Sequence, residues 1–327
     1  MSEKKTAARP AKLLIVGGGP GGRVSYITAR RFGVEPAVMV MNEEPTVICS
    51  LPYGVGRRLI PDGPEATVVD MTREKRLPPD AMKDVVFGSV TAIDAAAKTA
   101  TITGPAGETQ IAYENLILAP GAVPWLPPAE GILKGKGDAS GLMVAVGDRL
   151  VDRSFLADGV YVLRGAADAR ALDELAARSQ KVAVVGTGAV GLEIIEALSD
   201  RGVDVVAVEA LPHAVSALDA DMAAAVECRL RERGVELHLN DAVTSWTPGT
   251  LTLRSGALAA DALVFASGVR PRLDLARAMG LKTERGIVVD ATQRTSLPSV
   301  WAVGDAAQIA DAASGKSVLP LIGTLAM

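Results

Sequence analysis

The chain has 327 residues, of which 49% are apolar, and a formal net charge of -4. This composition excludes a disordered chain, and the length predicts two domains that each bury their own core. Basic and acidic residues are interspersed, and no apolar run is long enough for a signal peptide or a membrane span, so we expect neither nucleic acid nor a membrane as a partner.

The first predicted unit begins with an apolar strand at residues 12–16, which runs into the glycine cluster GGGPGG and then into a helix. Gly17, Gly19 and Gly22 occupy the G-x-G-x-x-G positions of a dinucleotide fingerprint, with Pro20 among them. In this motif the first glycine permits a tight turn, the second lets the backbone approach a pyrophosphate, and the third lets the helix pack closely on the strand. The helix that follows directs its N-terminal amides at the phosphates.

A second apolar strand at residues 37–41 completes this first unit, and the side chain that binds the ribose is expected directly after it. Both Asn42 and Glu43 stand there, and the sequence does not choose between them.

The middle of the chain carries weaker signals. Residues 85–118 are typical of short strands broken by turns, and residues 120–158 are rich in Pro, Gly and Lys without a long periodic element. We therefore expect a linker or an exposed insertion at residues 126–158.

A second strand–glycine–helix unit begins at residues 181–185 and continues into GTGAVG. Gly186, Gly188 and Gly191 take the fingerprint positions, with Val190 among them, and Glu209 follows the next strand roughly 20 residues on, as the motif requires. A carboxylate at that place pairs with a free ribose 2′-hydroxyl and repels a 2′-phosphate, so NADH is favoured over NADPH.

Two fingerprints at this separation resemble the FAD-dependent pyridine nucleotide-disulfide oxidoreductases. Four further segments carry the resemblance: NLILAPGAVP at 115–124, GLEIIEAL at 191–198, ALVFASGVRPRLDLA at 262–276 and RTSLPSVWAVGDAA at 294–307. The resemblance implies an α/β fold of two Rossmann-like three-layer dinucleotide-binding domains, with the NAD domain inserted into the FAD domain. The domains implied are FAD-binding at 1–125 and 270–327, a linker or insertion at 126–158, and NAD-binding at 159–269.

The same resemblance assigns roles to individual residues. Besides the fingerprint residues, Ala119, Pro120, Gly121, Gly304 and Asp305 are implied to bind FAD. Gly268 is implied to bind NAD, and Glu193 to face the nicotinamide.

Cys49 lies in Cys-Ser-Leu-Pro-Tyr, which resembles the C-x-L-P-Y segment of the family's single-cysteine branch: coenzyme A-disulfide reductases, NADH oxidases and peroxidases, and persulfide reductases. The resemblance makes Cys49, with Glu193, the catalytic pair, whereas a lone cysteine is otherwise often a small buried hydrophobe. Cys228 is expected to pack within a helix, and His213 and His238 are expected in surface or packing roles. The sequence holds no metal-ligand cluster.

The chain stops at LPLIGTLAM, where the resembled family continues into an interface domain. We expect either a truncated protein or a short form that relies on a second subunit. The two widely separated cysteines predict a reducing, cytoplasmic location.

Four functions follow as hypotheses. The first is NADH-dependent reduction of a small sulfur substrate, such as a coenzyme A disulfide or a persulfide, through FAD and Cys49. The second directs the electrons to oxygen or peroxide with a Cys49 sulfenic acid. The third is an electron-transfer subunit that reduces a redox protein, with Cys49 incidental. The fourth is a nucleotide-binding regulatory module without catalysis.

Overall fold

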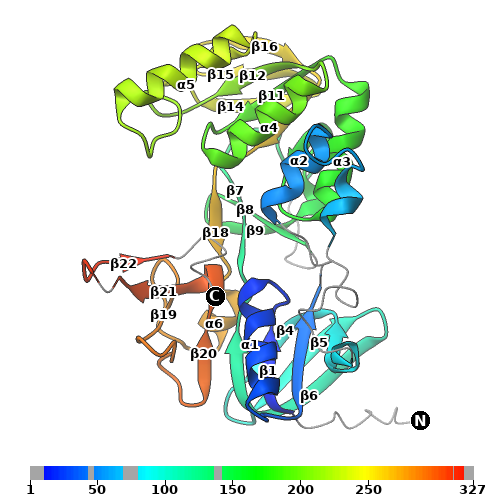
Figure 1. Ribbon diagram of the computed structural model, residues 1–327, viewed down its shortest axis with the longest axis vertical. Helices are drawn as coiled ribbons and strands as arrows, with labels where there is room; N and C mark the ends of the chain where they lie inside the picture. The colour runs from blue at the N-terminus through cyan, green and yellow to red at the C-terminus, as the bar shows by residue number, and fades with distance from the viewer. Residues whose placement is uncertain (1–10, 43–47, 69–79, 136–141, 312, 320–327) are drawn as a thin grey trace. The chain divides into compact units, whose positions relative to one another are not determined.

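The computed structural model describes residues 11–42, 48–68, 80–135, 142–311 and 313–319. The chain forms two compact units (Figure 1). The first comprises Met1–Glu43, Asp70–Ala122 and Pro271–Met327, and the second comprises Glu44–Val69 and Val123–Arg270. The first unit is therefore assembled from both ends of the chain, and the second is built mainly from the residues between them.

The first unit is built on a sheet in the order β3-β2-β1-β6-β5-β4, with β20 paired to β6. Its members are β1 (Ala11–Val16), β2 (Ala37–Met41), β3 (Val85–Phe87), β4 (Ser89–Asp94), β5 (Thr99–Gly104), β6 (Gly107–Leu118) and β20 (Val300–Ala302). The pairs β2–β3, β1–β2, β1–β6 and β6–β20 are parallel, whereas β4, β5 and the first half of β6 form an antiparallel meander. Leu14 and Ile15 of β1 are both 0% exposed although they point to opposite faces, because a parallel sheet is covered on both sides.

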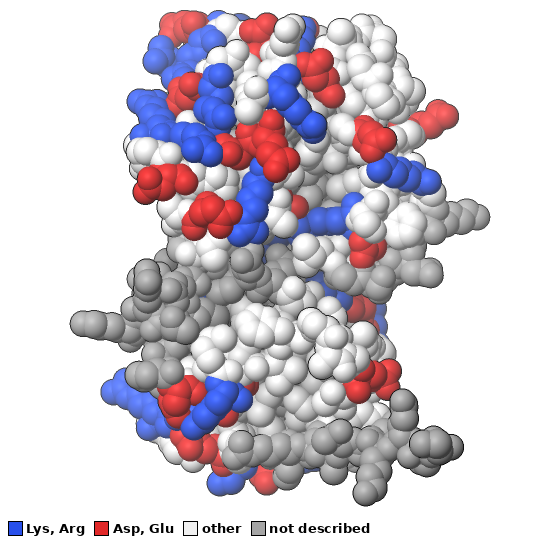
Figure 2. Space-filling model, turned by 90° about the vertical axis from the view of Figure 1, so that its right-hand side faces the viewer, with Lys and Arg blue, Asp and Glu red and all other residues white. Residues whose placement is uncertain are grey.

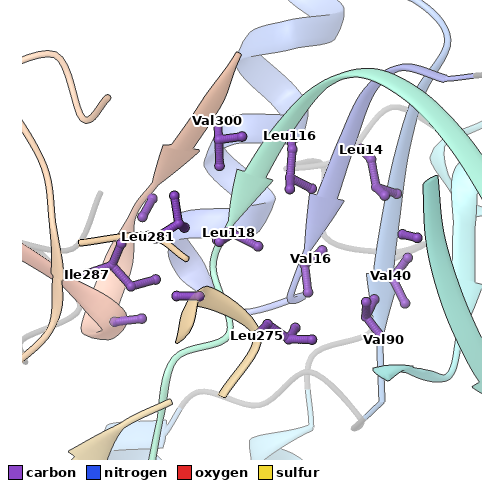
Figure 3. Packing of buried hydrophobic residues seen from close by; sticks show 14 of the residues in the cluster. Leu14, Val16, Val40, Val90, Leu116, Leu118, Leu275, Leu281, Ile287 and Val300 are labelled. Carbon is purple, nitrogen blue, oxygen red and sulfur yellow. The ribbon is translucent and has the colours of Figure 1, made fainter. Parts of the chain in front are cut away.

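The core of this unit joins segments from the two ends of the chain. Leu14 and Leu116 of the sheet pack in one cluster with Leu275, Ile287 and Val300 of the returning C-terminal segment (Figure 3). The unit also contains α1 (Pro20–Arg31), α6 (Asp274–Ala278), η3 (Ala81–Asp84), η5 (Gly304–Ala306), β19 (Ile287–Val288), β21 (Ala307–Ala310) and β22 (Ser317–Val318).

Helix α1 begins directly after the first glycine turn. Pro20 stands in its first turn, where a missing N–H removes no helical hydrogen bond, and Arg30 and Arg31 lie in its last turn, where they complement the helix dipole. The local sequence thus determines where this helix starts and ends.

The second unit is built on a parallel sheet in the order β10-β17-β11-β12-β13. Its members are β10 (Val160–Val162), β11 (Lys181–Val185), β12 (Asp204–Val208), β13 (Glu236–His238) and β17 (Ala262–Phe265). The unit also contains α3 (Ala166–Arg178), α4 (Ala189–Asp200), α5 (Ala220–Glu232) and the antiparallel strands β14 (Val243–Thr247), β15 (Gly249–Leu253) and β16 (Ala257–Ala260). The predicted α/β fold class, with a mainly parallel sheet in each unit, is confirmed.

The segment expected as a linker or insertion carries regular structure. β8 (Met143–Val146) and β9 (Arg149–Asp152) join β7 (Ala122–Leu126) and β18 (Val269–Pro271) in a sheet of order β18-β7-β8-β9, and η4 (Arg153–Phe155) follows β9. Val144 and Val151 are fully buried in the core of the second unit. These strands are only four residues long, which is too short to give a clear periodic signal in sequence.

The segment Glu44–Val69, which lies in sequence between two segments of the first unit, also belongs to the second unit. It contains η1 (Ile48–Ser50), α2 (Leu51–Gly56) and η2 (Pro64–Thr67), and α2 lies beside α3 and α4 (Figure 1). Leu51 and Val55 are buried in the same cluster as residues of α3 and α4.

The charged side chains on the face drawn in Figure 2 are of mixed sign. On the face drawn in Figure 2, Lys and Arg side chains alternate with Asp and Glu instead of gathering into a patch of one sign. Among the residues described, no helix has the length and apolar character needed to cross a membrane, and no group of His, Cys, Asp and Glu side chains is arranged to hold a metal ion.

Candidate functional site

The first glycine turn has the geometry that the fingerprint demands. Gly17 adopts a φ of +116°, and a Cβ added there would lie 1.9 Å from the carbonyl oxygen of Ala119. A Cβ on Gly22 would lie 1.9 Å from the carbonyl oxygen of Gly17, which is the close contact between helix and strand. A Cβ on Gly19 would meet no atom within 4 Å, so the backbone there faces open space at the N-terminus of α1. That opening fits a pyrophosphate.

The second glycine turn repeats this arrangement at the start of α4. Gly186 has a φ of +99°, and a Cβ there would approach the carbonyl oxygen of Ala266 to 2.5 Å. A Cβ on Gly191 would lie 2.0 Å from the carbonyl oxygen of Gly186, and one on Gly188 would meet nothing within 4 Å. Val190 is 46% exposed beside this opening. The residues of both turns fit a dinucleotide, although their binding roles stay predictions.

Other predicted FAD residues gather at the same edge of the first sheet. β1, β6 and β20 are adjacent and parallel, and they end at Val16, Leu118 and Ala302. Ala119 follows β6, and its amide donates to the carbonyl oxygen of Val16 at 2.8 Å. Pro120 and Gly121 continue from there, and Gly304, with a φ of +73° and open space around its missing Cβ, begins η5 together with Asp305. Ligands of open α/β sheets bind at such a carboxyl edge.

Of the two residues predicted to bind the FAD ribose, the structure describes one. Asn42 directly follows β2, is exposed, and donates from Nδ2 to Oγ of Ser89 at 3.2 Å. Glu43 lies outside the described residues.

Glu209 directly follows β12 and accepts three hydrogen bonds from its surroundings. Thr187 of the glycine turn donates its backbone N–H (2.9 Å) and its Oγ1 (3.0 Å) to Oε2, and the Leu211 amide donates to Oε1 at 3.0 Å. A carboxylate has about four acceptor positions, so these bonds fix Glu209 beside the turn and leave room for a ribose hydroxyl. Gly268 lies beyond β17 with a φ of +106° and open space around its missing Cβ.

Cys49, Tyr53 and Glu193 lie close together in the second unit. Cys49 is exposed in η1, and Tyr53 follows four residues later in the helical run that continues into α2. Residues at this spacing share one side of a helix. The Tyr53 hydroxyl donates to Oε1 of Glu193, in the second turn of α4, at 3.2 Å. The negative charge of Glu193, then this hydrogen bond, raise the pKa of Tyr53 above its usual range, and Cys49 contributes to the same shift.

An ion-pair network anchors the end of α2. Arg57, in the left-handed conformation at the C-cap, donates to both oxygens of Asp173 in α3, at 2.8 and 2.6 Å. Arg201 donates to Oδ1 of Asp173 and to the carbonyl oxygen of Val55, each at 2.8 Å. The hydrogen bond from Arg57, reinforced by Arg201, lowers the pKa of Asp173 against the opposing effect of burial.

Sequence reasoning missed the partners of the predicted pair. Tyr53 belongs to the Cys-Ser-Leu-Pro-Tyr segment, but the sequence assigned it no role. Its spacing of four residues from Cys49 is the signal that could have identified it. The links to Glu193 and Asp173 had no sequence signal, because these residues lie more than a hundred positions away along the chain.

The expectation for Cys228 was wrong. Its side chain is exposed on α5 and makes a long contact, 3.7 Å, with Oε1 of Glu232, so it does not pack within the helix interface. The apolar periodicity of α5 is weak, so the sequence did not indicate which face of this helix Cys228 occupies. His213 is partly buried beside the carbonyl oxygen of Ala214, and His238 contacts Glu236 at 2.9 Å.

Comparison with known proteins gives a consistent result. The family model described as "Pyridine nucleotide-disulphide oxidoreductase" matches residues 11–319. The NADH oxidase of Methanocaldococcus jannaschii is 29% identical over 332 residues, which cover 97% of this chain and 67% of that protein. The rubredoxin-NAD(+) reductase of Alcanivorax borkumensis is 33% identical over 204 residues, which cover 60% of this chain and 47% of that protein.

Among solved structures, an NAD-dependent persulfide reductase from A. fulgidus superimposes with a TM-score of 0.81 at 28% identity. The match covers 96% of this chain and 57% of that one. The chain thus spans about half to two thirds of the length of these relatives.

Proposed function

The chain belongs to the pyridine nucleotide-disulphide oxidoreductase family of FAD-dependent NAD(P)H oxidoreductases, and we propose that it uses NADH to reduce a small disulfide or persulfide through Cys49. One observation carries the proposal. The exposed Cys49 thiol lies one helical turn before Tyr53, which is bonded to Glu193 on the helix that follows the nucleotide fingerprint. An accessible thiol close to a carboxylate on that helix supports the proposed role of Cys49 and Glu193.

The cofactor roles follow the two glycine turns. We assign FAD to Gly17, Gly19, Pro20, Gly22, Ala119–Gly121, Gly304 and Asp305, with Asn42 or Glu43 at its ribose. We assign NADH to Gly186, Gly188, Val190, Gly191, Glu209 and Gly268. The open backbone at Gly19 and at Gly188 supports both assignments. FAD, when bound, supplies two-electron chemistry between a nicotinamide and a sulfur. The anchored carboxylate of Glu209 favours NADH, because it would repel a 2′-phosphate.

The chemistry proposed for Cys49 is thiolate attack on the substrate. The sulfur attacks a disulfide RS–SR, a Cys49–SR bond forms, and the departing RS⁻ takes a proton from solvent. Two electrons that originate in NADH then break the Cys49–SR bond, which restores the thiolate and releases the second RS⁻. The sum is RSSR + NADH + H⁺ → 2 RSH + NAD⁺. The exposure of Cys49 supports access for such a substrate, and it argues against the buried-hydrophobe alternative.

The test is an anaerobic titration of the purified protein with NADH, followed by visible absorption. A flavin spectrum that bleaches with one equivalent and shows a long-wavelength thiolate–flavin band is expected, and Cys49→Ser should remove both that band and the turnover of coenzyme A disulfide or persulfide. Cys228→Ser is the matched control, since it removes the other exposed thiol. Loss of the band in both variants, or in neither, contradicts the proposal.

A second candidate is an electron-transfer subunit or an oxidase. It is supported by the similarity to proteins called rubredoxin-NAD(+) reductase and NADH oxidase. In this case Cys49→Ser would leave NADH-driven reduction of rubredoxin unchanged, whereas an oxidase that cycles through a Cys49 sulfenic acid would lose its consumption of oxygen.

The free thiols of Cys49 and Cys228 support our proposal of a reducing, cytoplasmic location.

A further inference from the structure

We propose that Tyr53 is a positioning residue that holds the Glu193 carboxylate in its working orientation and keeps the Cys49 turn against α4. The inference rests on the proposed function, because it takes Glu193 and Cys49 as the reacting pair. Its evidence is separate: a hydrogen bond between two helices that are 140 positions apart in sequence.

The position of Tyr53 is determined by packing on both sides of it. Leu51 and Val55, on the same helix, are 0% and 1% exposed in the core that α3 and α4 share. Gly56 allows the close approach of α4, since a Cβ there would lie 3.0 Å from Cα of Ala197. Together with the Arg57–Asp173 pair, these contacts leave the ring of Tyr53 little freedom to withdraw from Glu193.

The electrostatic setting explains why a hydrogen-bond donor to Glu193 matters. A small pocket of about 140 Å³ is lined by Tyr53, Glu193, Glu196 and Asp200 together with Arg58. Arg58 pairs with Glu196 at 3.2 Å and with Asp200 at 3.5 Å. The neighbouring carboxylates repel the negative charge of Glu193. The hydroxyl of Tyr53 offsets this repulsion by donating a hydrogen bond to Glu193.

The hydroxyl also keeps its proton under working conditions. Glu193 opposes ionisation of Tyr53, and the pKa of Tyr53 is raised from a value that already lies near 10. Tyr53 is consequently a permanent donor near neutral pH, suited to orienting a carboxylate and unsuited to releasing a proton.

The first experiment is Tyr53→Phe in the FAD-loaded protein, with rapid mixing against NADH under anaerobic conditions. A donor to a charged group is worth on the order of tenfold, so bleaching of the flavin should slow by about tenfold. Tyr161→Phe is the matched control, because it also removes a hydroxyl that is hydrogen-bonded, at 2.8 Å to Arg178, in the same unit. Unchanged bleaching in Tyr53→Phe, or an equal loss in Tyr161→Phe, overturns the inference.

A double-mutant cycle tests whether Tyr53 acts through Glu193. In a Glu193→Ala background, Tyr53→Phe should slow bleaching by less than twofold, because the group that it positions is gone. A full tenfold loss in that background would show an independent role and overturn the inference. Bleaching does not require Cys49, so a wild-type rate of substrate turnover in Cys49→Ser would defeat the proposed function while the result for Tyr53 stands.

A readout without turnover covers the case in which Tyr53→Phe is unstable. The tyrosinate absorbance of the wild type and of Glu193→Gln, each titrated to alkaline pH, compares the ionisation of Tyr53 in the two proteins, because Tyr53 is bonded to that carboxylate. Glu193→Gln removes the negative charge and should move that ionisation to lower pH. No movement overturns the inference, since the hydroxyl would then not be bonded to Glu193.

Discussion

In the first unit, Asn42 directly follows the strand after the glycine turn, and its side-chain amide donates to Ser89 at the start of β4. In the second unit, the residue at the corresponding place is Glu209, which accepts hydrogen bonds from Thr187 in its own glycine turn and from Leu211. The turns themselves have the same geometry, because backbone clashes at Gly17 and at Gly186 allow no side chain. The comparison shows one turn geometry with two different residues at the strand ends. We therefore propose that the turn lets a dinucleotide approach and that the residue at the strand end distinguishes one nucleotide from another.

The largest expected effect comes from filling the clashing glycine of either turn. Gly17→Ala would place a methyl group 1.9 Å from a backbone oxygen at a φ of +116°, so we expect a loss of about 3 kcal/mol or more in the stability of the first unit, together with loss of FAD. Gly186→Ala should do the same to the second unit and to NADH binding. Thermal melting with flavin release, and NADH binding measured by titration, check the two cases.

Gly19→Ala and Gly188→Ala are the matched controls for this prediction. Neither methyl group would meet an atom within 4 Å, so stability should change by less than about 1 kcal/mol while nucleotide affinity falls. If Gly17→Ala were as stable as Gly19→Ala, the shared turn geometry would be refuted.

Asp173→Asn should loosen the packing of α2 in the second unit. Asp173 accepts from Arg57 and Arg201, and we expect a destabilisation of about 1–3 kcal/mol near neutral pH. Because the pKa of Asp173 is lowered in the folded protein, its stabilisation is fully present above the ordinary carboxyl pKa of about 3.9 and is lost as the pH falls through the lowered value.

Melting temperatures measured from pH 7 to pH 3 check this expectation. The difference between the wild type and Asp173→Asn should shrink below about pH 4. Cys49 should also react faster with iodoacetamide in the variant, since α2 is held less firmly. A constant difference across this pH range would show that the carboxylate charge is not what holds the segment.

Glu209→Gln sharpens the comparison at the level of nucleotide choice. The amide keeps the volume but loses the charge and one pair of acceptor positions, so we expect NADH to bind about tenfold more weakly and its advantage over NADPH to shrink. Steady-state KM values for both nucleotides measure this, and an unchanged preference would remove Glu209 from the specificity assignment.

Asn42→Ala should have the smallest effect. Its one described hydrogen bond is exposed and neutral, so FAD affinity should fall by about fivefold or less, with no change in the KM for NADH. Flavin release on dilution measures the affinity. A loss as large as that of Gly19→Ala would show that Asn42 has the anchoring role that Glu209 has in the second unit.

Much of the fold could be predicted because its signals are local. The apolar runs at residues 12–16 and 181–185, each followed by a glycine cluster and a helix, predict parallel strands, sharp turns and helix starts within windows of about a dozen residues. The short strands at residues 143–152 escaped prediction, because four residues contain too little periodicity to distinguish a strand from a loop.

The sequence by itself determined the α/β class, the two glycine turns and the identity of the residues at the strand ends, since each depends on the chemistry of neighbouring residues. Only the tertiary structure decided that the segment of Cys49 packs on α3 and α4, that Tyr53 meets Glu193, and that Asp173 binds Arg57 and Arg201. These contacts join parts of the chain that are distant in sequence, and they form only when the buried faces of several helices and strands are satisfied together.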